Sequence, residues 1–145
     1  DADFSHDPKD LKRLYTVCKE DNIDLVVGSR YIKGVNVVNW PLSRVLLSYT
    51  ASLYVRLITG MKVLDPTAGF VCYRRVVLEA INLDQIKFIG YAFQIEMKYI
   101  TYKNKFKIKE IPIIFTDRLY GDSKLSKGII SEAIFGVLQM RLKNF

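Results

Sequence analysis

Two aspartates at the beginning of the sequence, Asp1 and Asp3, have the residue type and the spacing to bind a divalent metal ion. They flank a single alanine, so both carboxylates point the same way if the backbone is extended. Two hard oxygen ligands on one side of a strand suit a cation such as Mg²⁺, which also binds phosphate oxygens. Such a triplet also arises by chance, and a solvated chain end is the alternative interpretation.

Two further segments carry residues that could handle phosphates. Residues 65–74, DPTAGFVCYR, begin with Asp65 in a turn-forming context. Farther along, Arg118 and Lys124 bracket a glycine-containing segment. Such a loop can close over a diphosphate while both cations neutralise its charge. A plain connecting loop would have the same composition, so the order and spacing of the segments carry the argument.

Taken in order, five parts of the sequence resemble the catalytic domain of dolichol-phosphate mannosyltransferases. They are residues 1–8 (DADFSHDP), 27–31 (VGSRY), 65–73 (DPTAGFVCY), 91–97 (YAFQIEM) and 112–124, with PIIF at 112–115 and DRLYGDSK at 117–124. The resemblance implies an inverting glycosyltransferase of family 2 with the GT-A fold, a Rossmann-like α/β fold for nucleotide-diphospho-sugar transferases. Bacterial relatives transfer glucose or aminoarabinose, so the resemblance leaves the sugar open.

The resemblance also implies roles for individual residues. Asp1 and Asp3 would bind Mg²⁺ or Mn²⁺, with Ser5 as a third polar contact. Arg30 and Arg44 would hold the phosphate of a polyprenyl phosphate acceptor. The other implied site residues are Ser48 as a further hydrogen-bond donor, Asp65 near the donor sugar, Gln94 or Glu96 in the cleft, and Arg118 and Lys124 at the diphosphate.

Simpler interpretations exist for several of these residues. Arg30 follows a predicted strand and could be a surface cation, and Arg44 could extend its charge outward from an apolar helix. Gln94 and Glu96 diverge by about 200° around a helix, so only one of them is expected to face the cleft.

The position of the Asp1-Ala2-Asp3 triplet departs from the family pattern. In the family it lies about halfway along the catalytic domain, after a nucleotide-binding half. We therefore expect residues 1–127 to be the C-terminal portion of that domain, with the half that binds base and ribose missing, and residues 128–145 to be an amphipathic helix on the domain or the membrane interface.

Length, charge and cysteine content restrict the class of protein. The chain has 145 residues, 50% of them hydrophobic, which is enough for the core of a single domain. Its net charge of +7 favours an anionic partner, such as a phosphorylated substrate or an acidic membrane surface. Cys18 and Cys72 have no metal-binding or disulfide spacing, which favours a reducing, cytosolic setting at the membrane face.

The densest basic cluster comprises Lys98, Lys103, Lys105, Lys107 and Lys109. The simpler interpretation is a solvated helix end and strand edge, where lysines also discourage edge-to-edge pairing. The alternative is a surface that faces an anionic membrane. Both interpretations place Lys98 in contact with solvent or lipid headgroups.

Helical and extended patterns alternate along the chain. Helices are predicted at 8–21, 41–59, 75–81, 93–103 and 128–145, and strands at 24–29, 70–74 and 107–116, with Pro112 at an edge or a bulge. Asp7 is the expected cap of the first helix. Residues 41–59 are apolar, but Arg44 and Arg56 interrupt the run, so we expect a core or interfacial helix rather than a membrane span.

Three functions remain open at this point. The first is transfer of a hexose, mannose or glucose, from a nucleoside-diphosphate sugar to a polyprenyl phosphate. The second is a family 2 transferase that acts on a saccharide acceptor. The third is a noncatalytic basic module on membrane or nucleic acid, although no nucleic-acid-binding motif is present and nucleic acid is not an expected partner.

Overall fold

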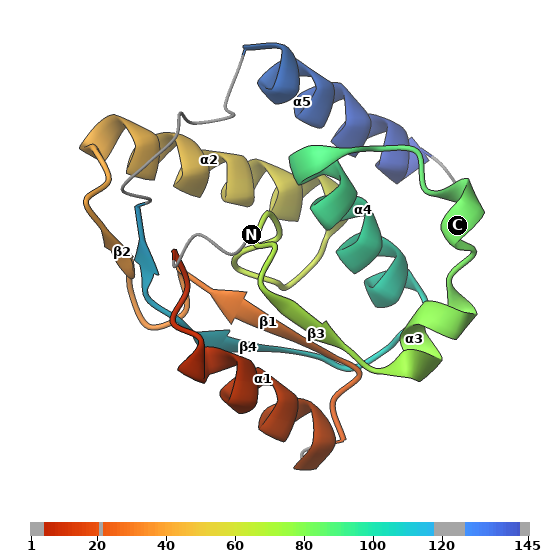
Figure 1. Cartoon of the computed structure of the whole chain (residues 1–145). Coiled ribbons are helices and arrows are strands. Elements are labelled where there is room, and N and C mark those ends of the chain that lie inside the picture. Colours follow the sequence, from red (N-terminus) through yellow and green to blue (C-terminus); the bar gives the residue numbers. More distant parts are fainter. Residues whose placement is uncertain (1–4, 21, 118–126, 143–145) are drawn as a thin grey trace.

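The computed structural model describes residues 5–20, 22–117 and 127–142, which form an α/β unit (Figure 1). The elements in chain order are α1 (Lys9–Glu20), β1 (Leu25–Ser29), β2 (Val37–Val38), α2 (Leu42–Thr59), β3 (Val71–Tyr73), α3 (Arg75–Ala80), the 3-10 helix η1 (Leu83–Gln85), α4 (Gly90–Lys103), β4 (Ile108–Pro112), β5 (Phe115–Thr116) and α5 (Lys127–Leu142). The predicted α/β class is confirmed.

Strand β1 is the middle strand of a three-stranded sheet with the order β3-β1-β4. It runs parallel to β4 and antiparallel to β3. All five of its residues are buried, as expected for a strand with a neighbour on each edge and helices on both faces. The predicted buried strand is confirmed, and its predicted parallel pairing holds for β4.

Helix α1 covers one face of this sheet. Leu14 and Cys18, one turn apart, pack against Val26 of β1 and against Ile111 and Ile113. The helix begins where predicted, because Asp7 Oδ1 accepts a hydrogen bond of 2.9 Å from the Lys9 N–H and so satisfies a donor of the first turn.

Helices α2 and α4 lie on the opposite side of the sheet, and α5 packs against these two helices (Figure 1). Leu25 and Val27 alternate with Val26 along β1 and therefore point to this second face. The three helices share one core, whose buried residues are Val55, Met61, Ala92, Ile95, Tyr99, Val137 and Met140. Helix α2 ends at Gly60, whose φ of 75° is the left-handed conformation that favours glycine.

Helix α5 packs against α2 and α4, and two contacts fix its position. The Tyr54 hydroxyl donates a hydrogen bond of 3.0 Å to the Ile134 carbonyl. A Cβ added to Gly136 would lie only 2.9 Å from Cε1 of Phe88, so glycine permits the close approach. The idea that α5 also touches a membrane stays a prediction. Within the described parts of the chain, no helix has both the length and the apolar character needed to cross a bilayer.

Two predicted boundaries are wrong. Helix α4 begins at Gly90, three residues before the predicted start, and Phe93 N–H donates to the Ile89 carbonyl to close its first turn. The predicted strand 107–116 is divided into β4 and β5. Strand β4 ends at Pro112, on the edge of the sheet as predicted, and β5 pairs in parallel with β2, a strand that was predicted as loop.

Candidate functional site

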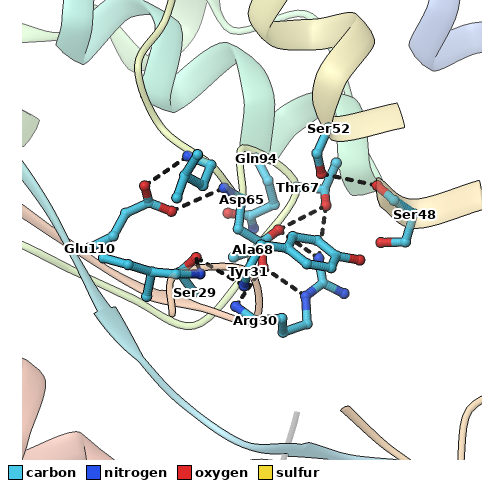
Figure 2. Close-up of polar contacts among 12 residues, drawn as sticks. Ser29, Arg30, Tyr31, Ser48, Ser52, Asp65, Thr67, Ala68, Gln94 and Glu110 are labelled. Atoms are coloured by element: carbon cyan, nitrogen blue, oxygen red, sulfur yellow. Dashed lines mark hydrogen bonds and ion pairs between the residues drawn. The ribbon is translucent and has the colours of Figure 1, made fainter. Parts of the chain in front are cut away.

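A buried ion pair between Arg30 and Asp65 forms the centre of the site (Figure 2). Arg30 Nε and Nη2 donate hydrogen bonds of 2.7 Å to the two carboxylate oxygens of Asp65, and the Arg30 backbone N–H adds a third of 3.0 Å. Asp65 is 0% exposed and Arg30 8% exposed. Thr67 Oγ1 accepts a further bond of 2.9 Å from Arg30 Nη2. The carboxylate thus fixes the orientation of the guanidinium.

The position of Arg30 follows from the strand that precedes it. Arg30 comes directly after β1, where the chain leaves the sheet, and its guanidinium carbon lies 5.4 Å from the ring centres of both Tyr31 and Trp40. Burial would lower the pKa of Arg30, but the hydrogen bonds and charge of Asp65 outweigh it and raise the pKa. Arg30 is therefore a permanent cation.

Glu110 stabilises the loop that carries Asp65. The two carboxylate oxygens of Glu110 accept hydrogen bonds from the Leu64 N–H, at 2.7 Å, and from the Asp65 N–H, at 3.0 Å (Figure 2). Glu110 belongs to β4, so the edge strand of the sheet anchors the start of the loop. The loop itself turns at once, because Ala68 N–H donates to the Asp65 carbonyl.

Lys98 anchors the other end of the same loop, and here the sequence interpretation was wrong. Its Nζ donates hydrogen bonds to the carbonyls of Ala68, at 2.6 Å, and of Gln94, at 3.1 Å. Lys98 is 0% exposed, so it belongs to the interior and not to a basic surface cluster. Burial lowers the pKa of Lys98 from its ordinary 10.5 to about 7, although the charges of Asp65 and Glu110 oppose this fall.

Arg44 lies near Arg30, on the first turn of α2. Its guanidinium carbon is 4.1 Å from the ring centre of Trp40, and its Nη1 forms an ion pair of 2.8 Å with Asp117. Trp40 therefore contacts both arginines, since the Arg30 guanidinium carbon lies 5.4 Å from its ring centre. Ser48 follows Arg44 by one helical turn, as the sequence predicted.

A groove of about 350 Å³ runs from these arginines along helix α2 toward α4 and α5. At one end it is lined by Arg30, Arg44, Ser48 and Thr67, together with Trp40. The remainder of the lining is largely apolar or aromatic and consists of Leu47, Thr50, Ala51, Tyr54, Val55, Tyr91, Ile95, Ala133 and Ile134. The groove thus has a cationic part with hydrogen-bonding side chains and a longer part that is largely apolar.

Gln94 and Glu96 lie in different surroundings. Gln94 lies next to the Asp65 loop, where its side-chain nitrogen is 3.7 Å from the position of a Cβ on Gly69 (Figure 2). Glu96 is 0% exposed, and its Oε2 accepts hydrogen bonds from the backbone N–H groups of Lys87 and Phe88. Gln94 is thus the one beside the candidate site, and Glu96 supports the segment before α4.

The predicted metal and diphosphate contacts lie mostly outside the described residues. This applies to Asp1, Asp3, Arg118 and Lys124. Ser5 is described and buried, and its carbonyl accepts a hydrogen bond of 3.0 Å from the Thr116 N–H. Across residues 5–20, 22–117 and 127–142, no cluster of three or more His, Cys, Asp or Glu side chains could hold a metal ion.

His6 connects Ser5 to the aromatic part of the site. Its ring stacks on Phe70 with the ring centres 4.5 Å apart and meets Phe115 edge-on at 5.0 Å. These contacts place the segment after the Asp1-Ala2-Asp3 triplet beside β5. The carboxylates of Asp1 and Asp3 are suitable ligands for a hard divalent cation, and Ser5 follows Asp3 by two residues.

Sequence reasoning missed Trp40, Glu110 and the interior role of Lys98. Glu110 and Trp40 have no distinctive spacing. Lys98 did leave a signal, since no other cation occurs between residues 91 and 102 of an otherwise mostly uncharged helix.

Comparisons with known proteins identify the family of the chain. Residues 1–81 match the family model of glycosyl transferase family 2. The undecaprenyl-phosphate mannosyltransferase of Micrococcus luteus is 44% identical over 142 residues, which are 98% of this chain and 58% of that protein. The polyprenol monophosphomannose synthase of Mycolicibacterium smegmatis is 43% identical over 143 residues, which are 99% of this chain and 54% of that protein. The chain thus spans a little over half the length of these curated relatives.

Proposed function

The chain belongs to glycosyl transferase family 2, and on that basis we propose that it is the acceptor-binding part of an enzyme that transfers a hexose to a polyprenyl phosphate. The donor in this proposal is a nucleoside-diphosphate sugar. Mannose is the sugar in the names of both relatives, which favours mannose over glucose here.

The observation that carries the proposal is the composition of the groove. A polyprenyl phosphate is an anion joined to a hydrocarbon chain, and the groove joins two arginines to an apolar length. The hydrogen bonds found among the described residues use Nε and Nη2 of Arg30 and leave its Nη1 for a ligand. Arginine is suited to phosphate because its planar fork can donate to two oxygens at once.

The acceptor chemistry needs few catalytic groups. A phosphate monoester is already ionised near neutral pH, so its oxygen can attack the anomeric carbon without a general base. Arg30 and Arg44 would orient that oxygen, and attack from the face opposite the leaving diphosphate would invert the configuration. Asp65 acts in this scheme through Arg30, because its carboxylate is already bonded to the guanidinium.

The donor side of the reaction rests mostly on residues outside the described ones. Asp1 and Asp3 would hold Mg²⁺ or Mn²⁺, which when bound stabilises the charge of the departing diphosphate. Arg118 and Lys124 would add positive charge there. Ser5 would be the third polar contact of that metal ion, Gln94 would lie near the sugar, and Ser48 would hydrogen-bond the acceptor phosphate.

The groove argues against the other two functions. A saccharide acceptor presents a hydroxyl group, which requires a carboxylate base in the acceptor site. None of the described residues that line the groove is an aspartate or a glutamate. A noncatalytic basic module would not need a buried, bidentate Arg30–Asp65 pair beside a groove.

A place on the cytosolic face of the membrane completes the proposal. Helix α2 exposes Leu42, Leu46, Leu53 and Leu57, and α5 exposes Phe135 and Leu142. Exposed apolar side chains on these two helices, together with a net charge of +7, suit the surface of an anionic bilayer, which also holds the acceptor.

A transfer assay tests the proposed function. The full-length natural protein that contains this chain is incubated with Mg²⁺ or Mn²⁺, a polyprenyl phosphate, and labelled GDP-mannose or UDP-glucose. We expect acid-labile lipid-linked mannose. Label that appears in a soluble saccharide, with none in lipid, would replace the proposal with the second function.

A further inference from the structure

Lys98 is a cation with no exposed surface, although a lysine is seldom fully buried. It lies in the interior half of α4 between Met97 and Tyr99, both buried. An apolar side chain of similar length would fill this space without the cost of taking an ammonium group out of water. A group retained at such a cost is a candidate for a role in function.

The contacts of Lys98 point to the Asp65 loop. Its Nζ lies 2.6 Å from the Ala68 carbonyl, at the end of the loop that begins with Asp65. Glu110 holds the beginning of the same loop through two backbone N–H groups. Lys98 therefore binds the end of this loop and Glu110 binds its beginning, and both stabilise the loop that orients Arg30.

Among the described groups of the site, positive and negative charges are equal in number only when Lys98 is protonated. The described cations are Arg30, Arg44 and Lys98, and the described carboxylates are Asp65, Glu110 and Asp117. Arg30 pairs with Asp65 and Arg44 with Asp117, which leaves Lys98 and Glu110 at the two ends of the Asp65 loop. Loss of the Lys98 proton leaves one negative charge in excess, in a weakly screened interior beneath the groove where an anion would bind.

We propose that Lys98 is a positioning residue for the anionic acceptor: it holds the Asp65 loop at Ala68, and its positive charge offsets the buried carboxylates of Asp65 and Glu110. This inference rests on the proposed function. The protonated form of Lys98 favours acceptor binding, and by linkage the bound phosphate favours the protonated form. Acceptor binding near neutral pH is therefore accompanied by proton uptake at Lys98.

Burial makes such proton uptake accessible at ordinary pH, because it lowers the pKa of Lys98 more than the facing carboxylates raise it. Asp65 in the loop, Glu110 on β4 and Arg30 after β1 all interact with it electrostatically. Burial brings the pKa of Lys98 to about 7, so a nearby phosphate can raise it through the range in which most assays are run. Proton uptake distinguishes this role from packing alone, because a residue that only fills space takes up no proton.

Isothermal titration calorimetry in buffers of different ionisation enthalpy measures this uptake directly. The probe is farnesyl phosphate, and the protein is the full-length natural protein at pH 7.5. We expect the wild type to take up about half a proton more per bound ligand than Lys98→Met. We also expect the variant to bind the probe about tenfold more weakly at pH 6.5. Lys103→Met, on the exposed end of the same helix, is the control and should match the wild type.

A second variant keeps the inference testable if Lys98→Met does not fold. Glu110 raises the pKa of Lys98, so Glu110→Gln should move the pH midpoint of proton uptake downward. Equal uptake in the wild type and Lys98→Met, or an unmoved midpoint in Glu110→Gln, would overturn the role of Lys98 and leave the proposed function intact. Failure of the wild type to bind farnesyl phosphate at any pH would overturn both.

Discussion

The Arg30–Asp65 pair shows how a buried carboxylate can fix the orientation of an arginine that lines a groove. Arg30 Nε and Nη2 and the two carboxylate oxygens of Asp65 are buried, and the Asp65 backbone N–H is bound by Glu110. Such a pair adds little net stability but is costly to break, because one charge is left buried without a partner. Its benefit is the fixed direction in which Arg30 faces the groove.

Asp65→Asn should therefore destabilise the protein strongly. We expect a loss of about 3–5 kcal/mol in the free energy of unfolding, measured by urea denaturation, because the amide cannot neutralise Arg30. Glu79→Gln, which removes the exposed ion pair with Arg75, is the matched control and should have no measurable effect. An equally small effect of Asp65→Asn would show that the buried pair is not intact in solution.

The titration of Lys98 gives a second prediction at the residue scale. Its pKa is about 7 in the folded protein and about 10.5 in the unfolded chain, so between these values the unfolded chain binds more protons. The stability of the wild type should then rise with pH by up to roughly 1.4 kcal/mol per unit across this window. Below pH 7 the cost of burying the charge is present in full.

Lys98→Met should lack this pH dependence, so its stability relative to the wild type should be highest near pH 6 and lower at pH 9. Urea denaturation at pH 6, 7.5 and 9 measures the difference, with Lys103→Met as the control. A difference that does not vary with pH would mean that Lys98 keeps an ordinary pKa.

At the scale of elements, hydrophobic patterning predicted most of the fold. The buried strand β1, helix α1 with its Asp7 cap, and helix α2 were all found close to their predicted bounds. The pattern failed at β2 and β5, because two-residue strands have no periodicity and exist only through pairing across the chain. It also failed at Lys98, whose burial depends on the Asp65 loop packing against α4, a contact between distant segments.

The candidate site, too, could be predicted only in part from the sequence. Arg44 and Ser48 could be placed on one helix face from sequence, because they are one turn apart. The pairing of Arg30 with Asp65 and the aromatic contacts of Trp40 could not be, because they arise where β1, α2 and the Asp65 loop meet. Local spacing carries no information on such contacts.

The packing of α5 gives a prediction at this scale. Gly136 allows α5 to approach Phe88, so Gly136→Leu should push the helix away and widen the groove at Ala133 and Ile134. We expect a loss of about 1–3 kcal/mol of stability, as for other overpacked cores, together with weaker binding of polyprenyl phosphate. Gln139→Leu, on an exposed position of the same helix, is the control. Unchanged stability in Gly136→Leu would show that α5 does not pack as described.

At the scale of the whole molecule, the three-stranded sheet is a platform with two different sides. Helix α1 closes one face, and α2, α4 and α5 build the groove on the other (Figure 1). The polar end of the groove lies where β1 ends, and the apolar end lies between helices that also expose leucines. One ligand that is polar at one end and apolar along its length would match both parts.

Trp40 is the only tryptophan in the chain and contacts both arginines, so its fluorescence reports on the groove directly. The decisive measurement is a titration of the full-length protein with polyprenyl phosphate, with the uncharged polyprenol and inorganic phosphate as comparisons and Trp40→Phe as the blank. We expect a saturable change with polyprenyl phosphate at concentrations where neither comparison responds. Arg44→Ala should weaken this binding about tenfold or more, whereas Arg75→Ala should not. An equal response to the uncharged polyprenol, or an unchanged affinity in Arg44→Ala, would contradict the assignment of the groove to a lipid phosphate.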